Sequence, residues 1–145
     1  MKVIDLIGVR ADVFSVRDES TVHEAAQYLR DRQVRSVGVL DSSGRLVGVV
    51  SQSDISEKVA AENKCPAWMR VSEIMSTTLV TVSPDRSLPD CLRLMEQNGF
   101  YHLLVVDGAG GYLGMVSVRD LLSVIASDEK ARADMLEAFM FERPS

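Results

Sequence analysis

The sequence predicts a mixed α+β fold that contains two copies of one β-α-β-β-α unit, followed by a C-terminal helix. The first observation is an internal repeat, because a shift of 66 residues lays residues 12–55 onto residues 78–121 without a gap. The second is that each copy combines an apolar stripe at helical spacing with short apolar runs typical of strands. Since one copy cannot bury its apolar faces alone, we expect the two copies to pack around a pseudo-two-fold axis.

Each copy begins with an extended segment and a helix. The segments "VFSV" and "LVTV" are short and rich in β-branched residues, which favours strands. In the following "VHEAAQYL" and "LPDCLRLM", apolar residues recur at i, i+3, i+4 and i+7, which places them on one face of a helix. Thr21 or Ser20, and Ser87, are candidate N-caps, and Gly99 is a candidate C-terminal stop.

The remainder of each copy predicts a hairpin and a second helix. The runs "VGVL" and "LLVV" lead into the turn-rich "DSSG" and "DGAGG", and the chain returns as "LVGVV" and "YLGMV". This pattern is typical of a β-hairpin. The second helix is expected to begin near Ser51 in the first copy and near Ser117 in the second. Cys91 falls on the apolar stripe of its helix, so we expect it to be a buried thiol.

The segments divide the chain into four parts. "VIDLI" near the start resembles "VSEIM" before the second copy, so each copy has a short lead-in. Between the copies lies a linker interrupted by Pro66, and we expect Trp68 to anchor it to the core. The tail is expected to be a helix whose apolar stripe packs on its own domain or contacts a second copy of the chain. That stripe consists of Met135, Leu136, Phe139 and Met140. The resulting parts are repeat 1 at 1–62, the linker at 63–70, repeat 2 at 71–126, and the C-terminal helix and tail at 127–145.

The composition argues against several classes of function. The 145-residue chain has a formal net charge of −5 and scattered Lys and Arg residues, whereas a general nucleic-acid binder needs a basic face. No apolar run approaches the roughly 18–20 residues that span a bilayer, and charged residues come too early for a secretory signal. Two cysteines cannot form a disulfide framework. We therefore expect a cytoplasmic protein that acts without nucleic acid and without a membrane.

A Ser-x-x-Asp motif occurs in both copies, within "GVVSQSD" and "GMVSVRD". At a strand-to-helix junction it is close to a capping box, which satisfies free backbone N–H groups and needs no ligand. Alternatively, the helix N-terminus and the hydroxyl hold a phosphate, while the carboxylate accepts hydrogen bonds from two vicinal hydroxyls. A phosphate and a diol in one small ligand indicate a ribonucleotide. The residues themselves leave both interpretations open.

The two units with these motifs resemble a pair of cystathionine β-synthase (CBS) domains, the Bateman module. The resemblance extends from residue 3 to about residue 125, and "VSEIMSTTLVTVSPD" and "YHLLVVD" also stand where the family has counterparts. It implies a regulatory module that binds AMP, ADP, ATP or S-adenosylmethionine in two clefts between the repeats and requires no other cofactor. It also implies a homodimer that signals to a separate, unidentified protein.

The resemblance further implies which residues form the two clefts. For the second cleft it implies Ser117, Arg119 and Asp120, with His102 near the phosphate, and Val9, Val13 and Val34 against the base. For the first cleft it implies Ser51, Ser53 and Asp54, with Ser36 or Arg35 near the phosphate, and Met75, Thr77, Leu79 and Phe100.

The chain departs from the family pattern at Gly38 and Leu104, where the family often has proline. The residues expected near the phosphate also differ between the repeats, with Arg35-Ser36 in the first and Tyr101-His102 in the second, so we expect the two clefts to be inequivalent. We expect the second cleft to favour a phosphorylated ligand, because His102 and Arg119 can both form charge-assisted hydrogen bonds.

Other functions fit the sequence less well. His102, Ser117 and Asp120 are the residue types of a hydrolase triad, but the glycine pattern of a nucleophile elbow does not surround the serine, so we expect no enzyme and no catalytic residue. The two histidines lie far apart without partners at ligand spacing, so we expect no metal site. The alternative that keeps the fold is a ligand-free dimerisation or scaffold module, in which the Ser-x-x-Asp motifs only cap helices.

Overall fold

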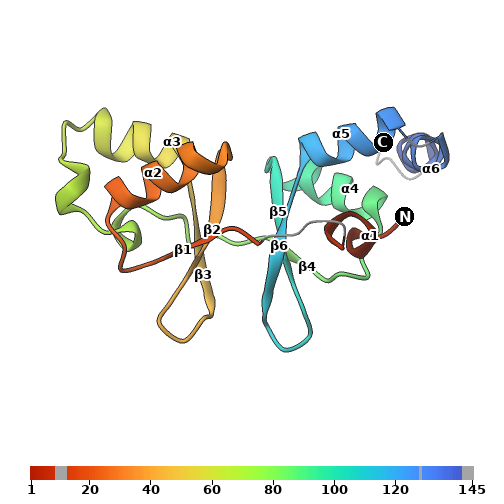
Figure 1. Ribbon diagram of the computed structural model, residues 1–145. Helices are drawn as coiled ribbons and strands as arrows, with labels where there is room; N and C mark the ends of the chain where they lie inside the picture. Colours follow the sequence, from red (N-terminus) through yellow and green to blue (C-terminus); the bar gives the residue numbers. More distant parts are fainter. Residues whose placement is uncertain (9–12, 128, 142–145) are drawn as a thin grey trace.

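The computed structural model describes residues 1–8, 13–127 and 129–141. In these residues, six strands form two three-stranded sheets that lie next to each other at the centre of the molecule (Figure 1). The helices of the two repeats lie towards opposite ends. The predicted α+β fold with two β-α-β-β-α repeats is confirmed.

Repeat 1 contains the first sheet. Its elements are β1 (Ser15–Arg17), α2 (Val22–Arg32), β2 (Ser36–Leu40), β3 (Leu46–Ser51) and α3 (Gln52–Ile55). β1 pairs with β2 in parallel, and β2 pairs with β3 antiparallel. The second helix begins where the sequence predicts, but α3 is short and continues as a π-helix, Ser56–Ala60. The apolar stripe of α2, predicted from its spacing, is buried against this sheet.

Repeat 2 contains the second sheet and has the same topology. Its elements are β4 (Thr81–Val82), α4 (Leu88–Asn98), β5 (His102–Val106), β6 (Tyr112–Ser117) and α5 (Val118–Ser127), and α6 (Glu129–Phe141) follows. β4 pairs with β5 in parallel, and β5 pairs with β6 antiparallel. Cys91 is fully buried on α4, as predicted, and burial raises the pKa of its thiol to about 11. It therefore acts as a small apolar side chain in the core.

The predicted helix ends are confirmed. The Glu24 N–H donates to the Thr21 hydroxyl at 3.1 Å, and the Asp90 N–H donates to the Ser87 hydroxyl at 3.2 Å. Gly99 closes α4 with a φ of 69°, in the left-handed region that glycine adopts without strain.

The two lead-in segments exchange places between the repeats. α1 (Val3–Ile7) packs into the core of repeat 2, and the Val3 N–H donates to the Arg86 carbonyl at 2.9 Å. Conversely, the lead-in of repeat 2 packs into the core of repeat 1, where the Val71 N–H donates to the Ser20 carbonyl at 2.8 Å. Figure 1 shows α1, in red, beside α4 in the half that otherwise belongs to repeat 2. Each core is thus completed by residues of the other repeat's lead-in.

The anchoring role predicted for Trp68 is wrong. This residue ends a short 3₁₀-helix, Pro66–Trp68, and its side chain is 86% exposed. The linker is held instead by the backbone, because the Val22 N–H donates to the Met69 carbonyl at 2.8 Å. The fully buried Val71 completes this attachment.

The predicted C-terminal helix is present as α6, which lies against α5 and α4. Two residues of its apolar stripe, Leu136 and Met140, are exposed. The side chains of Met135 and Phe139 lie outside the described set. Among the described residues, no helix combines the length and the apolar character needed to cross a bilayer.

Candidate functional site

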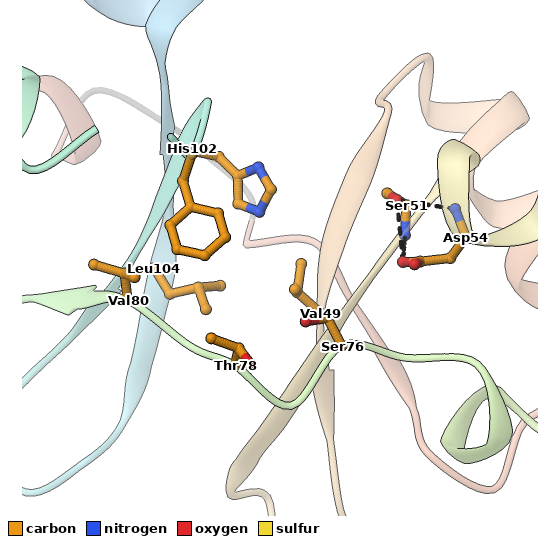
Figure 2. Close-up of a pocket in the computed structure, with 9 residues that line it drawn as sticks. Val49, Ser51, Asp54, Ser76, Thr78, Val80, His102 and Leu104 are labelled. Carbon is orange, nitrogen blue, oxygen red and sulfur yellow. Dashed lines mark hydrogen bonds between the residues drawn. The ribbon is translucent and has the colours of Figure 1, made fainter. Parts of the chain in front are cut away.

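A cleft of about 140 Å³ lies between the two repeats. Figure 2 shows Ser51 and Asp54 on one side of it, facing His102, Leu104 and Val80 on the other. The lining residues are Val49, Ser51, Asp54, Ser76, Thr78, Val80, Phe100, His102 and Leu104. The cleft therefore combines one carboxylate, several hydroxyls and one imidazole with an apolar wall.

Strand alternation explains which side chains reach the cleft. Val49 and Ser51 are two residues apart on β3, so they point to the same side of the sheet. His102 and Leu104 are likewise two residues apart on β5. The segment before β4 is placed by Ser76, whose N–H donates to the Val49 carbonyl at 2.8 Å and whose carbonyl accepts from the Val49 N–H at 3.0 Å.

Ser51 and Asp54 form the capping box that the motif predicts. The Ser51 N–H and hydroxyl both donate to Asp54 Oδ2, at 2.9 and 3.0 Å, and the Asp54 N–H donates to Ser51 Oγ at 3.2 Å. Lys58 Nζ lies 3.1 Å from Asp54 Oδ1 and donates to the Ile74 carbonyl at 2.9 Å. A carboxylate has about four acceptor positions, so Asp54 can still accept hydrogen bonds from the cleft. The capping role and a ligand role are compatible here.

His102 faces this carboxylate from the opposite repeat. Burial lowers the pKa of its imidazole below the ordinary value, while the negative charge of Asp54 acts in the opposite direction. Near neutral pH the imidazole is therefore uncharged, with one nitrogen that donates and one that accepts. An anion bound in the cleft would favour the protonated form and raise this pKa.

The lowered pKa of His102 makes stability depend on pH in a defined direction. The unfolded chain, with a histidine pKa of about 6.5, binds a proton more readily than the native protein, so stability falls as pH falls through that value. We expect His102→Gln to reduce this loss, measured as the free energy of unfolding in urea at several pH values. His23→Gln, at an exposed position on α2, is the control for the loss of a histidine outside the cleft. An identical pH dependence in His102→Gln and wild type would contradict the expectation.

The structure brings together only part of the set that the resemblance implies for the first cleft. Ser51, Asp54 and Phe100 line it. Ser53 and Arg35 are exposed. Met75, which the resemblance also implies, packs against the core of repeat 1 and does not line the cleft. Ser36, Thr77 and Leu79 are also not among the residues that line it.

In the segment before β4, the residues that face the cleft differ by one position from those that the resemblance implies. Ser76, Thr78 and Val80 line the cleft, whereas the resemblance implied the residues that alternate with them. A shift by one position exchanges the two faces of an extended segment, and the pairing of Ser76 with Val49 sets that register. Sequence reasoning also missed Val49 and Leu104, although each lies two residues from a predicted site residue and alternation could have indicated them.

The residues implied for the second cleft are placed differently. The Ser117 N–H donates to Asp120 Oδ2 at 2.8 Å, and the Asp120 N–H donates to Ser117 Oγ at 3.1 Å, so this pair also caps its helix. Arg119 is exposed. His102 is the register partner of Ser117, but it lines the cleft of Ser51 and Asp54.

The hydrophobic wall implied for the second cleft is not assembled in the described residues. Val13 is 50% exposed, and Val34 packs against the core of repeat 1. Val9 lies outside the described residues. Within the described part of the chain, no three His, Cys, Asp or Glu side chains come close enough together to hold a metal ion.

Comparison with known proteins identifies the fold unit. The family model of the CBS domain matches residues 3–61 and 71–127, which are the two repeats. The chain belongs to the CBS domain family. Its CBS pair is 33% identical to the CBS domain-containing protein YhcV of Bacillus subtilis over 119 residues, which cover 82% of this chain and 83% of that protein. Five other curated relatives are longer, and the chain spans between 17% and 65% of their lengths.

Solved structures show the same fold. A CBS domain protein from Pyrobaculum aerophilum, complexed with AMP, superposes with a TM-score of 0.81 at 20% identity and covers 94% of this chain and 98% of its own. The CBS domain pair of protein MJ0100, in complex with 5′-methylthioadenosine and S-adenosyl-L-methionine, gives a TM-score of 0.76 at 23% identity, with coverages of 87% and 96%. At these identities the likeness concerns the fold.

Proposed function

We propose that this CBS pair is a regulatory module that binds an adenosine-type ligand in the cleft between its repeats. The observation that carries the proposal is the position of Asp54, which lines the cleft from repeat 1 opposite His102 from repeat 2. The carboxylate accepts hydrogen bonds from a ribose diol, and the imidazole lies where it can contact a phosphate. Phe100 and Leu104 offer apolar surface to a base. The adenosine ligands of the two solved CBS pairs support the same ligand class.

The size of the cleft suggests how binding is converted into a signal. Ligand pockets usually measure about 300–1,000 Å³, whereas this cleft measures about 140 Å³. A nucleotide is larger than this volume, so we propose that the orientation of the two repeats differs between the free and the bound protein. Such a ligand binds the two orientations of the repeats with different affinity, which is the condition for shifting their populations. The proposal includes the homodimer, the cytoplasmic location and the separate regulated protein expected from the sequence.

Calorimetric titration with AMP, adenosine, ATP and S-adenosylmethionine tests this function. Hydrogen bonds to a charged group contribute about 1.5–3 kcal/mol, so we expect Asp54→Ala to weaken binding by about 10- to 150-fold. Ser87→Ala is the control, because it removes a helix cap outside the cleft and should leave the affinity unchanged. The capping boxes favour a ligand-free scaffold as the second candidate. Absence of heat with all four compounds would support the scaffold and reject the proposal.

A further inference from the structure

The repeat allows the two clefts to be compared position by position. With the shift of 66 residues, Ser117 and Asp120 correspond to Ser51 and Asp54. The side chains around these two pairs differ. Val49, His102 and Leu104 line the first cleft and correspond to Met115, Ser36 and Gly38, while Leu46 corresponds to Tyr112. In the second cleft, two of these side chains contact the opposite repeat directly.

Met115 makes the first contact. It stands on β6 at the position of Val49, and its longer side chain reaches the opposite repeat. The Ser36 hydroxyl donates to Met115 Sδ at 3.4 Å, within the range of a weak hydrogen bond to sulfur. Ser36 itself stands at the position of His102. The two side chains that correspond to opposite walls of the first cleft therefore touch each other in the second.

Tyr112 makes the second contact. The register of β5 and β6 shifts between Val105 and Val106, which pair with Gly114 and Tyr112, so Leu113 is an extra residue on β6. Because of this bulge, Tyr112 faces the same side of the sheet as Met115, although it is three residues away.

The ring of Tyr112 then covers Gly38 on β2. A methyl group added at Gly38 would lie 2.7 Å from Tyr112 Cζ, so the ring rests directly on the backbone of the opposite repeat. Gly38 and Tyr112 correspond to Leu104 and Leu46, and Leu104 lines the first cleft. At these two positions one side of the molecule has a tyrosine against a glycine, whereas the other side has two leucines.

We infer that Met115 and Tyr112 close the second cleft, so that the chain binds a single adenosine-type ligand, in the first cleft, between Asp54 and His102. This inference rests on the proposed function and adds the number of ligands and the residues that determine it. It reverses the preference for the second cleft that the sequence suggested. Asp120 keeps its capping role and does not contact the ligand.

Two matched variants test the inference with AMP as the probe. Asp54 and Asp120 each accept from the N–H of their capping serine, at 2.9 and 2.8 Å, so alanine removes this capping contact in both and, at Asp54, also the ion pair with Lys58. Calorimetry of the wild-type chain should give one AMP per chain. Asp54→Ala should weaken binding at least about tenfold, and Asp120→Ala should leave the affinity within a factor of about two.

A third variant tests the closing side chains themselves. Met115→Val combined with Tyr112→Leu places the residues of the first repeat in the second cleft, and we expect a second AMP to bind. A count that stays at one would overturn the assignment of closure to these side chains. Two AMP per wild-type chain, or equal losses in Asp54→Ala and Asp120→Ala, would overturn the inference while the proposed function stands. Failure of the wild-type chain to bind AMP, adenosine, ATP or S-adenosylmethionine rejects the proposed function itself.

Discussion

Leu103→Ala should lower the free energy of unfolding by about 2–5 kcal/mol. Leu103 is the second residue of β5 and is fully buried in the core of repeat 2, together with Leu88 and Leu121. Alanine leaves a cavity there, because the residues around it belong to strands and helices that cannot close in without losing their own contacts. Since a domain is typically stable by about 5–15 kcal/mol, this single change removes a large share of the total.

Urea denaturation followed by circular dichroism measures this effect. Leu122→Ala is the matched control, because Leu122 lies on α5 with 59% of its surface exposed. Its substitution should change stability by no more than about 0.5 kcal/mol. Equal losses in the two variants would mean that the core of repeat 2 is not packed as described.

Gly48→Ala should lower stability by about 1–3 kcal/mol and also weaken ligand binding. A methyl group at Gly48 would lie 2.6 Å from Met75 Sδ and 3.0 Å from the Ser76 carbonyl oxygen. The methionine side chain can turn away. The carbonyl cannot move freely, because it accepts from the Val49 N–H at 3.0 Å. Relief of the clash therefore displaces Ser76, which lines the cleft.

Gly108→Ala provides the comparison for this substitution. No atom beyond its chain neighbours lies within 4 Å of a methyl group added at Gly108, so stability should change by no more than about 0.5 kcal/mol. AMP titration of both variants then separates a general loss of stability from a change at the cleft. Wild-type affinity in Gly48→Ala, despite lower stability, would show that Ser76 does not shape the site.

The local structure could be predicted because its causes lie within short segments. The spacing of apolar residues places α2 and α4, and the hydroxyls of Thr21 and Ser87 start them where the sequence indicates. The order of strands follows from the repeat and from the turns between apolar runs. The extent of α3 did not follow, because no local sequence pattern marks its continuation as a π-helix.

The composition of the cleft was harder to predict because it depends on contacts between segments far apart. The pairing of Val49 with Ser76 decides which face of the segment before β4 turns inward, and no pattern within that segment reveals it. The bulge on β6 changes the facing of Tyr112 in a way that simple alternation misses. The exposure of Trp68 also depends on its surroundings, since the backbone attachment of the neighbouring Met69 leaves the indole without a role in the core.

The exchanged lead-ins have a mechanical consequence. The Leu88 N–H donates to the Met1 carbonyl at 3.1 Å, so the first residue is attached to repeat 2. A force that pulls on the N-terminus therefore acts first on repeat 2, although repeat 1 follows the N-terminus along the chain. Proteolytic cleavage between residues 62 and 71 would not separate the two halves, because the core of each half still contains the lead-in segment of the other. We therefore expect the two halves to unfold together, because each core contains residues of the other repeat.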